Sequence, residues 1–462
     1  METKLNYKRT FLIGLAFLSI CSFWQMYDNI IPLILQNTYH LGETMTGAVM
    51  ALDNVLAIFL LPVFGMLSDK VHTKLGRRMP FIVAGTILAV IFMMLLPMID
   101  NAEKARWSTG ESFSNQVIFL AVLFFTLVSM GLYRSPAVAL MPDVTPNHLR
   151  SRANAVINLM GAVGGVYALI MIKVLVGKGE TPDYLPLFAS IAAVMAIAVG
   201  ILVITIRENK LREEVEKAET VNAGTIEEKA IAEGVEAAGE IEAVADTEQS
   251  GATGKVKGMT KEVKRSMYFM LASIFLWFTA YNAVTTAFSR YTKVVWKMEG
   301  GSFANCLMVA TVAAILSYIP IGNISAKIGR KKTIMGGVLL MAACYGAAIF
   351  AREYHPLVNV AFALIGVAWA AINVNSYPMI VAMSSGSDVG KFTGTYYTFS
   401  MAAQILTPVL SGFLLENVSY NTLFPYALFF SLMAFLTMTQ VRHGDVKPQR
   451  KESILENFDV DD

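Results

Sequence analysis

The fold is decided by Gly65-Met66-Leu67-Ser68-Asp69-Lys70, which is followed after a short spacer by Gly76-Arg77-Arg78. This stretch closes one long apolar run and opens the next, so it predicts a short polar loop between two membrane helices. A related stretch, Gly322-Asn323-Ile324-Ser325-Ala326-Lys327-Ile328-Gly329-Arg330-Lys331-Lys332, again lies between two apolar runs. The chain is therefore predicted to consist of two related membrane-spanning halves.

The composition indicates that the chain is embedded in a membrane. Of its 462 residues, 55% are hydrophobic and 16% are charged, whereas soluble domains average about 25% charged. The net charge is only +2, and no domain is strongly basic. A nucleic-acid partner is therefore not expected. Cys21, Cys306 and Cys344 fall in separate apolar runs, which favours small core residues over a metal site or a disulfide framework.

Apolar runs of roughly 20 residues or more, enough to cross about 30 Å of hydrocarbon, recur twelve times. The first is too long for the apolar core of a signal peptide, which has about 7–15 residues. We predict helices near 11–36, 44–67, 80–99, 115–141, 152–176, 185–206, 266–290, 303–326, 333–351, 357–384, 391–415 and 420–440. The expected fold is an all-α integral membrane protein with twelve transmembrane helices in two six-helix bundles.

The distribution of basic residues predicts the orientation. With both termini in the cytosol, 28 of the 37 Lys and Arg residues lie inside, 8 lie outside, and Arg134 lies within the membrane. This agrees with the positive-inside rule. We expect a first bundle over 1–206, a cytosolic linker over 207–265, a second bundle over 266–441 and a cytosolic tail over 442–462.

The linker differs in composition from the bundles. It is rich in Glu, Ala and Gly and carries 14 acids against 10 bases, so it is predicted to be flexible. Its first part, from Arg207 to Glu219, could extend the sixth helix.

The repeated pattern G-x-x-x-D-x-x-G-R-[RK] resembles the cytoplasmic loop signature of the major facilitator superfamily. Glycines allow helix ends to approach closely, the acid can meet a helix N-terminus or an arginine, and the basic cluster stays in the cytosol. In the second copy Ala326 replaces the acid, which puts an ion pair of that loop in doubt. The loop residues that carry the signature are Gly65, Asp69, Gly76, Arg77, Arg78, Gly322, Gly329, Arg330 and Lys331.

Three ionisable residues are predicted at membrane depth, where a charge is costly and usually functional. Counting about 1.5 Å per residue puts Asp28 and Asp53 at similar depth, a little outside the midplane. Either could carry a proton, or the two could share a cation, although each could instead be a structural acid bonded to neighbouring helices. Arg134 falls deeper toward the cytosol, so pairing with Asp53 would need helix tilt. It could also bind a substrate hydroxyl or extend to the cytosol.

Aromatic and amide side chains near mid-depth in both halves are of the types that bind a sugar. Trp24, Gln25 and Asp28 share one helix face, and a sugar needs an aromatic platform beside amides and carboxylates. Such residues also pack helices together, but transporters bind substrate at this depth. The further candidates for substrate binding are Arg134, Asn158, Trp277, Tyr281, Asn282, Trp369, Asn373, Asn375, Tyr397 and Gln404, with Ser400 on the same helix as Tyr397.

No motif indicates an enzyme or a cofactor. The chain lacks a nucleotide-binding G-x-x-x-x-G-K-[ST] loop and an H-E-x-x-H metal motif. We therefore expect no metal or cofactor, and energy for uphill transport from an ion gradient.

Four further stretches resemble the sucrose transporters and their bacterial relatives, within the glycoside–pentoside–hexuronide:cation symporter group. They are Gly76-Arg77-Arg78-Met79-Pro80-Phe81, Ala139–Pro146 with Arg150–Asn154, Gly366–Ala370, and Thr393–Tyr397. The resemblance implies that Asp53 matches the first acid of the cation site in the melibiose permease branch. That branch's other two acids fall on Ala57 and Arg134, so the resemblance favours proton over sodium symport, with Asp53 or Asp28 as carrier.

The sequence therefore predicts a proton-coupled symporter for a disaccharide, oligosaccharide or glycoside in the cell membrane. Two alternatives stay open. The many Met and Phe residues suit a proton-driven exporter of amphipathic compounds, and the long linker suits a non-transporting membrane sensor.

Overall fold

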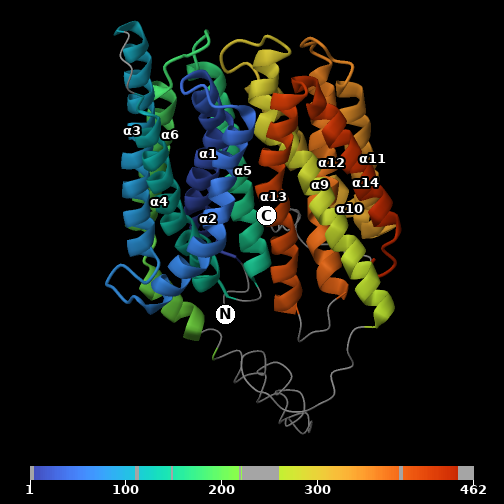
Figure 1. Cartoon of the computed structure of the whole chain (residues 1–462). Helices are drawn as coiled ribbons and strands as arrows, with labels where there is room; N and C mark the ends of the chain where they lie inside the picture. The colour runs from blue at the N-terminus through green and yellow to red at the C-terminus, as the bar shows by residue number, and fades with distance from the viewer. Residues whose placement is uncertain are drawn as a thin grey trace, which may run out of the picture.

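The computed structural model describes residues 5–109, 114–146, 149–217, 220, 260–383 and 389–445. These parts of the chain form long α-helices that run side by side (Figure 1). The helices are α1 (Tyr7–Asn37), α2 (Glu43–Lys70), α3 (Met79–Thr109), α4 (Gln116–Asp143), α5 (Arg150–Leu175), α6 (Leu185–Thr205), α9 (Lys261–Val294), α10 (Ala304–Ile328), α11 (Arg330–Ala348), α12 (Val358–Met383), α13 (Val389–Asn417) and α14 (Leu423–Thr439), with a 3-10 turn η3 (Tyr420–Thr422) before α14.

The twelve predicted runs correspond to these twelve helices. Within the described chain, eleven helices are long and apolar enough to cross a membrane. The twelfth, α11, has 19 residues and begins with Arg330, Lys331 and Lys332, which lower its mean hydropathy. Several helices run beyond their apolar cores; α3, predicted to end near 99, continues to Thr109. Adding residues to an existing helix is far easier than starting one.

The helices form two six-helix bundles with matching contacts. In the first bundle α1 packs on α5 and α6, and α4 packs on α2 and α3. The second bundle repeats this arrangement, because α9 packs on α13 and α14, and α12 packs on α10 and α11. The bundles meet mainly where α2 contacts α13 and where α5 contacts α10, so a cavity can lie between them.

Glycines permit the closest of these contacts. A Cβ atom added to Gly164 of α5 would lie 2.0 Å from the Leu18 carbonyl oxygen of α1. One added to Gly47 of α2 would lie 2.0 Å from the Pro408 carbonyl oxygen of α13. Any side chain at either position would push the two helices apart.

The loop between α2 and α3 is held by ion pairs. It lies at the end of the bundles where α1 begins and α14 ends, which we call the terminal face. Arg77 forms a bidentate pair with Asp143 of α4, at 2.6 and 3.1 Å. Arg78 pairs with the same carboxylate at 2.8 Å and with Asp69 at 2.5 Å. The acid of the loop signature therefore contacts an arginine, which is one of the two roles expected for it.

The segment after α6 also holds this loop. The buried Glu208 carboxylate accepts backbone N–H bonds from Arg77, Arg78 and Met79 at 2.9–3.1 Å. It thereby caps the N-terminus of α3. Gly76 is needed here because its φ is +124° and because a Cβ would lie 2.1 Å from the Glu208 carboxylate. The linker thus begins as an ordered part of the first bundle.

The helix predicted over Arg207–Glu219 is a separate one. Residues 208–217 are helical, but 206–207 interrupt the path from α6. Residues 218–219, 221–259 and 446–462, which include most of the predicted flexible linker and tail, lie outside the described parts of the chain.

The loop between α10 and α11 is held in an equivalent way. Asp445, beyond the end of α14, accepts the Lys331 backbone N–H at 3.0 Å and lies against Gly329, whose φ is +97°. Burial lowers the pKa of Arg330 while the Asp445 charge raises it. Asp445 therefore corresponds to Glu208 of the first bundle, and Ala326 stands where the first copy has the acid Asp69.

We expect Glu208→Gln to destabilise the protein. An amide is a weaker acceptor for three N–H donors, so the loss should be on the order of 1–3 kcal/mol. Thermal unfolding of the purified protein in detergent measures it as a lower midpoint. Glu216→Gln is the control, since the exposed Glu216 carboxylate pairs with Arg212 on the same helix, and such surface pairs contribute little. Equal midpoints for the two variants would contradict the capping role.

Candidate functional site

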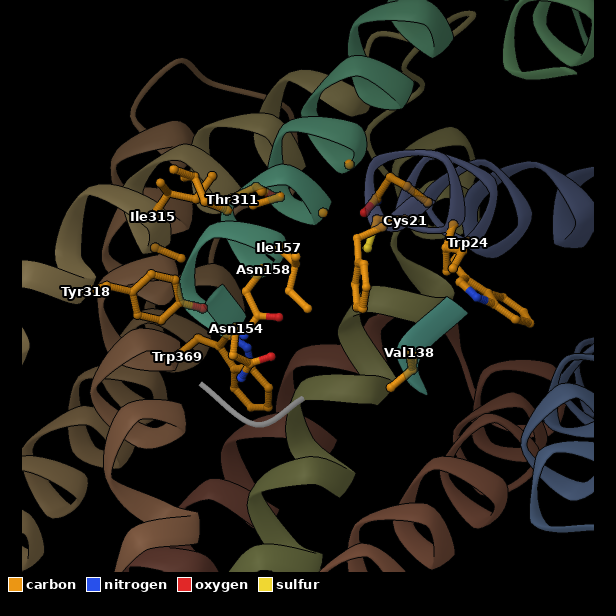
Figure 2. A pocket seen from close by; sticks show the side chains of 18 of the residues that line it. Cys21, Trp24, Val138, Asn154, Ile157, Asn158, Thr311, Ile315, Tyr318 and Trp369 are labelled. Carbon is orange, nitrogen blue, oxygen red and sulfur yellow. The ribbon is translucent and has the colours of Figure 1, made fainter. Parts of the chain in front are cut away.

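A cavity of about 560 Å³ lies between the two bundles. Its lining comes from α1, α4 and α5 of the first bundle and from α9, α10, α12 and α13 of the second (Figure 2). Its size is in the range of small-molecule sites. The structure brings together in its lining eight of the predicted site residues: Trp24, Gln25, Asp28, Arg134, Asn158, Tyr281, Trp369 and Tyr397.

The other predicted residues do not line this cavity. The buried Asn375 amide donates to the Ala371 carbonyl at 2.9 Å and accepts from Ser325. Gln404 donates to the Ser400 carbonyl of its own helix at 3.4 Å, and Trp277 is fully buried. Asn282, Asn373 and Asp53 are also absent from the lining. Mid-depth position alone was therefore a poor guide to which amides face the cavity.

The charged groups form one cluster in the first bundle. Asp28 lines the cavity. Asp53 of α2 is outside the lining but near enough for the two carboxylates to interact electrostatically. Asp53 accepts a hydrogen bond from the neighbouring Asn54 amide at 2.8 Å and also interacts with the charge of Arg134. The Arg134 guanidinium lies over the Trp24 indole, 5.8 Å from the ring centre, in a cation–π contact. The structure therefore brings Arg134 close enough to Asp53 for the two charges to interact, although the depth count along the helices had placed it nearer the cytosol.

Tyr27 belongs to the same cluster, although we did not predict it. Its ring stacks on Phe23 at 6.0 Å and meets the edge of Trp24 at 5.5 Å. Its hydroxyl is buried, interacts electrostatically with Asp53 and Asp28, and has no hydrogen-bond partner among the described residues. Buried polar groups are rarely left unpaired, so this hydroxyl is available to bond to water or to a ligand beside the two carboxylates.

The second bundle presents aromatic rings to the cavity. Tyr281 of α9 and Trp369 of α12 stack in parallel, with ring centres 3.8 Å apart and planes 6° from parallel. Phe278 meets the Trp369 indole edge-on at 5.3 Å, which fixes its orientation. This pair offers the broad rigid apolar surface on which the C–H face of a sugar ring can lie.

Sequence reasoning missed several residues that line the cavity. Asn154 precedes Asn158 by four residues and so shares its helix face, a spacing that could have identified it. Thr311, Ile315 and Tyr318 of α10 likewise recur at helical spacing. Cys21, expected to be a small core residue, is partly exposed in the lining, whereas Cys306 and Cys344 are buried.

The bundles are locked together at the face opposite the termini. Glu43 at the start of α2 pairs with Arg290 of α9 at 2.7 Å, and these side chains are 5% and 3% exposed. Tyr420 donates a hydrogen bond to Glu43. Glu416 of α13 accepts bonds from the Thr44 backbone N–H and hydroxyl at 2.8 and 2.5 Å. These contacts close the cavity on that side.

The cavity extends instead toward the terminal face. Its lining includes Met141 and Pro142 in the last turn of α4 and Asn154 in the first turns of α5. The ion pairs Glu43–Arg290 and Lys178–Glu299 and the hydrogen bonds of Thr44 and Glu43 join the bundles at the opposite face. The structure is therefore closed at that face, and the cavity extends toward the terminal face.

Such an arrangement defines a class of protein. Two matching helical bundles around one polar cavity near mid-membrane are typical of secondary transporters, which open the cavity alternately to each side. The chain has the architecture of this class, with helices in its described part that are long and apolar enough to cross a membrane many times.

Comparison with known proteins identifies the family. The model of the Major Facilitator Superfamily matches residues 12–309 and 298–457, so the chain belongs to this superfamily. Among solved structures it is similar to the nucleoside transporter NupG, with a TM-score of 0.65 and 14% identity over 94% of this chain and 100% of the other. It is also similar to a bacterial homologue of the iron transporter ferroportin in an inward-facing state, with a TM-score of 0.64 and 12% identity over 95% and 99%. These likenesses concern the fold.

Curated relatives match only part of the chain. Sucrose transport protein SUC4 of Arabidopsis thaliana is 35% identical over 116 residues, which is 24% of this chain and 22% of that protein. Sucrose transport protein SUT3 of Oryza sativa subsp. japonica is 26% identical over 137 residues, 28% and 27% of the two chains. The chloramphenicol resistance protein CraA of Acinetobacter baumannii is 30% identical over 101 residues, 22% and 24%. The chain thus covers less than a third of each relative.

Proposed function

We propose that this transporter is a proton-coupled symporter for a disaccharide, oligosaccharide or glycoside. The observation that supports it most is the joint lining of one cavity by a carboxylate, an arginine, three amides and a stacked aromatic pair. Sugars are bound by this combination, because hydroxyls pair with the polar groups and C–H faces lie on the rings. The partial similarity to sucrose transport proteins favours the same substrate class.

The coupling ion in this proposal is a proton carried by Asp53 or Asp28. Within the described chain no group of three His, Cys, Asp or Glu residues could hold a metal ion. A proton needs only one carboxylate and no ligand shell. Sugar and proton would each favour the same occluded state, so each raises the affinity for the other.

The proposed orientation places the terminal face in the cytosol. The basic residues Arg77, Arg78, Arg330 and Lys331 gather there, as the positive-inside rule requires of a cytosolic surface. The cavity would then be open to the cytosol, and the linker and tail would be cytosolic.

A second candidate is a proton-driven exporter of amphipathic compounds. The apolar residues that α10 contributes to the lining favour it, as does the partial similarity to a chloramphenicol resistance protein. Competition for the site by sugars or by lipophilic cations separates the two functions.

The proposal is tested by pH changes outside lightly buffered, energy-depleted cells that express the protein. Pulses of sucrose, maltose, melibiose and raffinose are added in turn, with and without sodium. Alkalinisation with at least one sugar, absent in cells without the protein, is the expected result. If expression is confirmed and no sugar changes the external pH, with or without sodium, the exporter becomes the favoured function.

A further inference from the structure

The first turns of α9 carry basic and aromatic side chains on one side of the helix. Residues three and four positions apart lie on the same side of a helix, and a hollow of about 510 Å³ runs along this side. We call the six residues that line it the α9 stripe: Lys261, Lys264, Arg265, Tyr268, Phe269 and Ala272. The first four are exposed, so the stripe points away from the bundles.

The opposite side of the same turns packs into the protein. Ser266, Met267 and Met270 are buried. The Ser266 hydroxyl bonds to the His443 ring at 2.8 Å and accepts the Arg442 backbone N–H at 3.1 Å. Both partners lie just beyond the end of α14, so α9 begins at the terminal face, where Figure 1 shows its start at the outer edge of the second bundle.

The length of α9 places the stripe at the membrane boundary. The helix has 34 residues, which is about 50 Å at 1.5 Å per residue, whereas the hydrocarbon core is about 30 Å thick. Its first turns therefore extend past the hydrocarbon into the headgroup layer. Lys261 lies about 16 Å nearer the water than Ala272 along the axis, so the charged end faces headgroups and the apolar end faces acyl chains.

The cations of the stripe form no ion pair with another described residue. Arg265 lies over the Phe269 ring, 5.7 Å from its centre, in a cation–π contact that holds it close to the apolar end. Glu262, at the neighbouring position to Lys261, leaves these turns with a net charge of +2. The complementary partner is therefore an anion from outside the described chain.

We propose that the α9 stripe binds an anionic glycerophospholipid of the leaflet at the terminal face. The lipid phosphate lies among the three cations, and an acyl chain lies along Tyr268, Phe269 and Ala272. Tyrosine is typical of this depth, because its ring is apolar and its hydroxyl is polar. A soluble anion would leave the apolar end of the stripe unused, and a zwitterionic lipid would bring its ammonium group against the same cations. The site is separate from the cavity between the bundles.

Native mass spectrometry of the purified full-length protein tests the proposal. The protein in detergent is titrated with phosphatidylglycerol or with phosphatidylcholine of the same acyl chains, and the fraction that carries one lipid gives each Kd. Each cation near an anionic membrane surface contributes about fivefold to binding. Phosphatidylglycerol is therefore expected to bind about 10-fold or more tightly than phosphatidylcholine.

Neutralising the stripe should remove this preference. In Lys261→Gln/Lys264→Gln/Arg265→Gln, the affinity for phosphatidylglycerol should fall about 10-fold or more, while the affinity for phosphatidylcholine changes little. Size-exclusion chromatography confirms that the variant is folded.

A matched variant removes the same charge elsewhere at the terminal face. Lys210→Gln/Arg212→Gln/Lys217→Gln lies on the helix over 208–217, where Lys210 and Arg212 pair with acids of their own helix. This variant should keep the wild-type preference for phosphatidylglycerol.

Three results would overturn the proposal. Equal affinity of the wild type for the two lipids would show that the stripe does not select a charged headgroup. An equal loss in both triple variants would show a general effect of net charge. Displacement of phosphatidylglycerol by soluble glycerol phosphate would show that the stripe holds a soluble anion and not a membrane lipid.

Discussion

Asp53→Asn is expected to abolish uphill accumulation of the substrate while leaving downhill exchange. A membrane potential of 100 mV supplies about 2.3 kcal/mol per proton. With one proton per substrate molecule, this sustains roughly 50-fold accumulation. Asparagine cannot carry the proton, so the ratio of inside to outside substrate should fall to about 1. Exchange needs no net proton movement and should continue.

Uptake and counterflow in right-side-out vesicles measure the two activities. Glu353→Gln, which neutralises an acid exposed on a loop, is the control and should accumulate like the wild type. Asp28→Asn extends the test, since Asp28 lines the cavity and interacts electrostatically with Asp53. Undiminished accumulation in Asp53→Asn would remove Asp53 from the coupling mechanism and leave Asp28 as the candidate.

Glu43→Gln is expected to open the face opposite the termini. It leaves the Arg290 guanidinium, only 3% exposed, without its ion-pair partner whenever this face is closed. Removing one partner of a buried pair costs about 3 kcal/mol or more, which shifts the equilibrium toward the opposite opening roughly a hundredfold. The equilibrium shifts because water can hydrate the Arg290 guanidinium once this face is open.

The native Cys21 reports this change. It is partly exposed in the cavity, whereas Cys306 and Cys344 are buried. An impermeant maleimide should label Cys21 in the wild type from the terminal face, and in Glu43→Gln also from the other face. Cys21→Ser confirms the labelled site.

Two further variants complete this experiment. Glu43→Gln/Arg290→Gln removes both charges and should restore much of the wild-type pattern. Lys178→Gln breaks the exposed pair with Glu299 at the same face, 3.4 Å long, and should change little. One-sided labelling in Glu43→Gln would show that this ion pair does not hold the face closed.

Much of the fold was predictable because membrane helices are specified locally. A run of about 20 apolar residues must satisfy its own backbone hydrogen bonds in lipid, so the number and order of the helices follow from hydropathy. The repeated loop pattern around Asp69 and Gly329 identified the doubling, and the Asp69–Arg78 contact is one that the pattern anticipated.

The cavity was predictable only in part. Helical periodicity correctly placed Trp24, Gln25 and Asp28 on one face, and they line the cavity together. Periodicity cannot say which face of a helix meets the cavity, however. Asn375 lies about 9 Å beyond Trp369 along α12 and turns into the contact with α10, where Ser325 satisfies its amide oxygen.

The sequence by itself determined the membrane-spanning class, the twelve helices, their pairing into two halves and part of the polar cavity. Those features depend on hydropathy and on residues close together in the chain. Tertiary structure alone decided the Glu43–Arg290 ion pair between the bundles, the caps made by Glu208 and Asp445, and which helix faces line the cavity. Each of these joins residues from distant helices, and their meeting depends on how the two bundles pack.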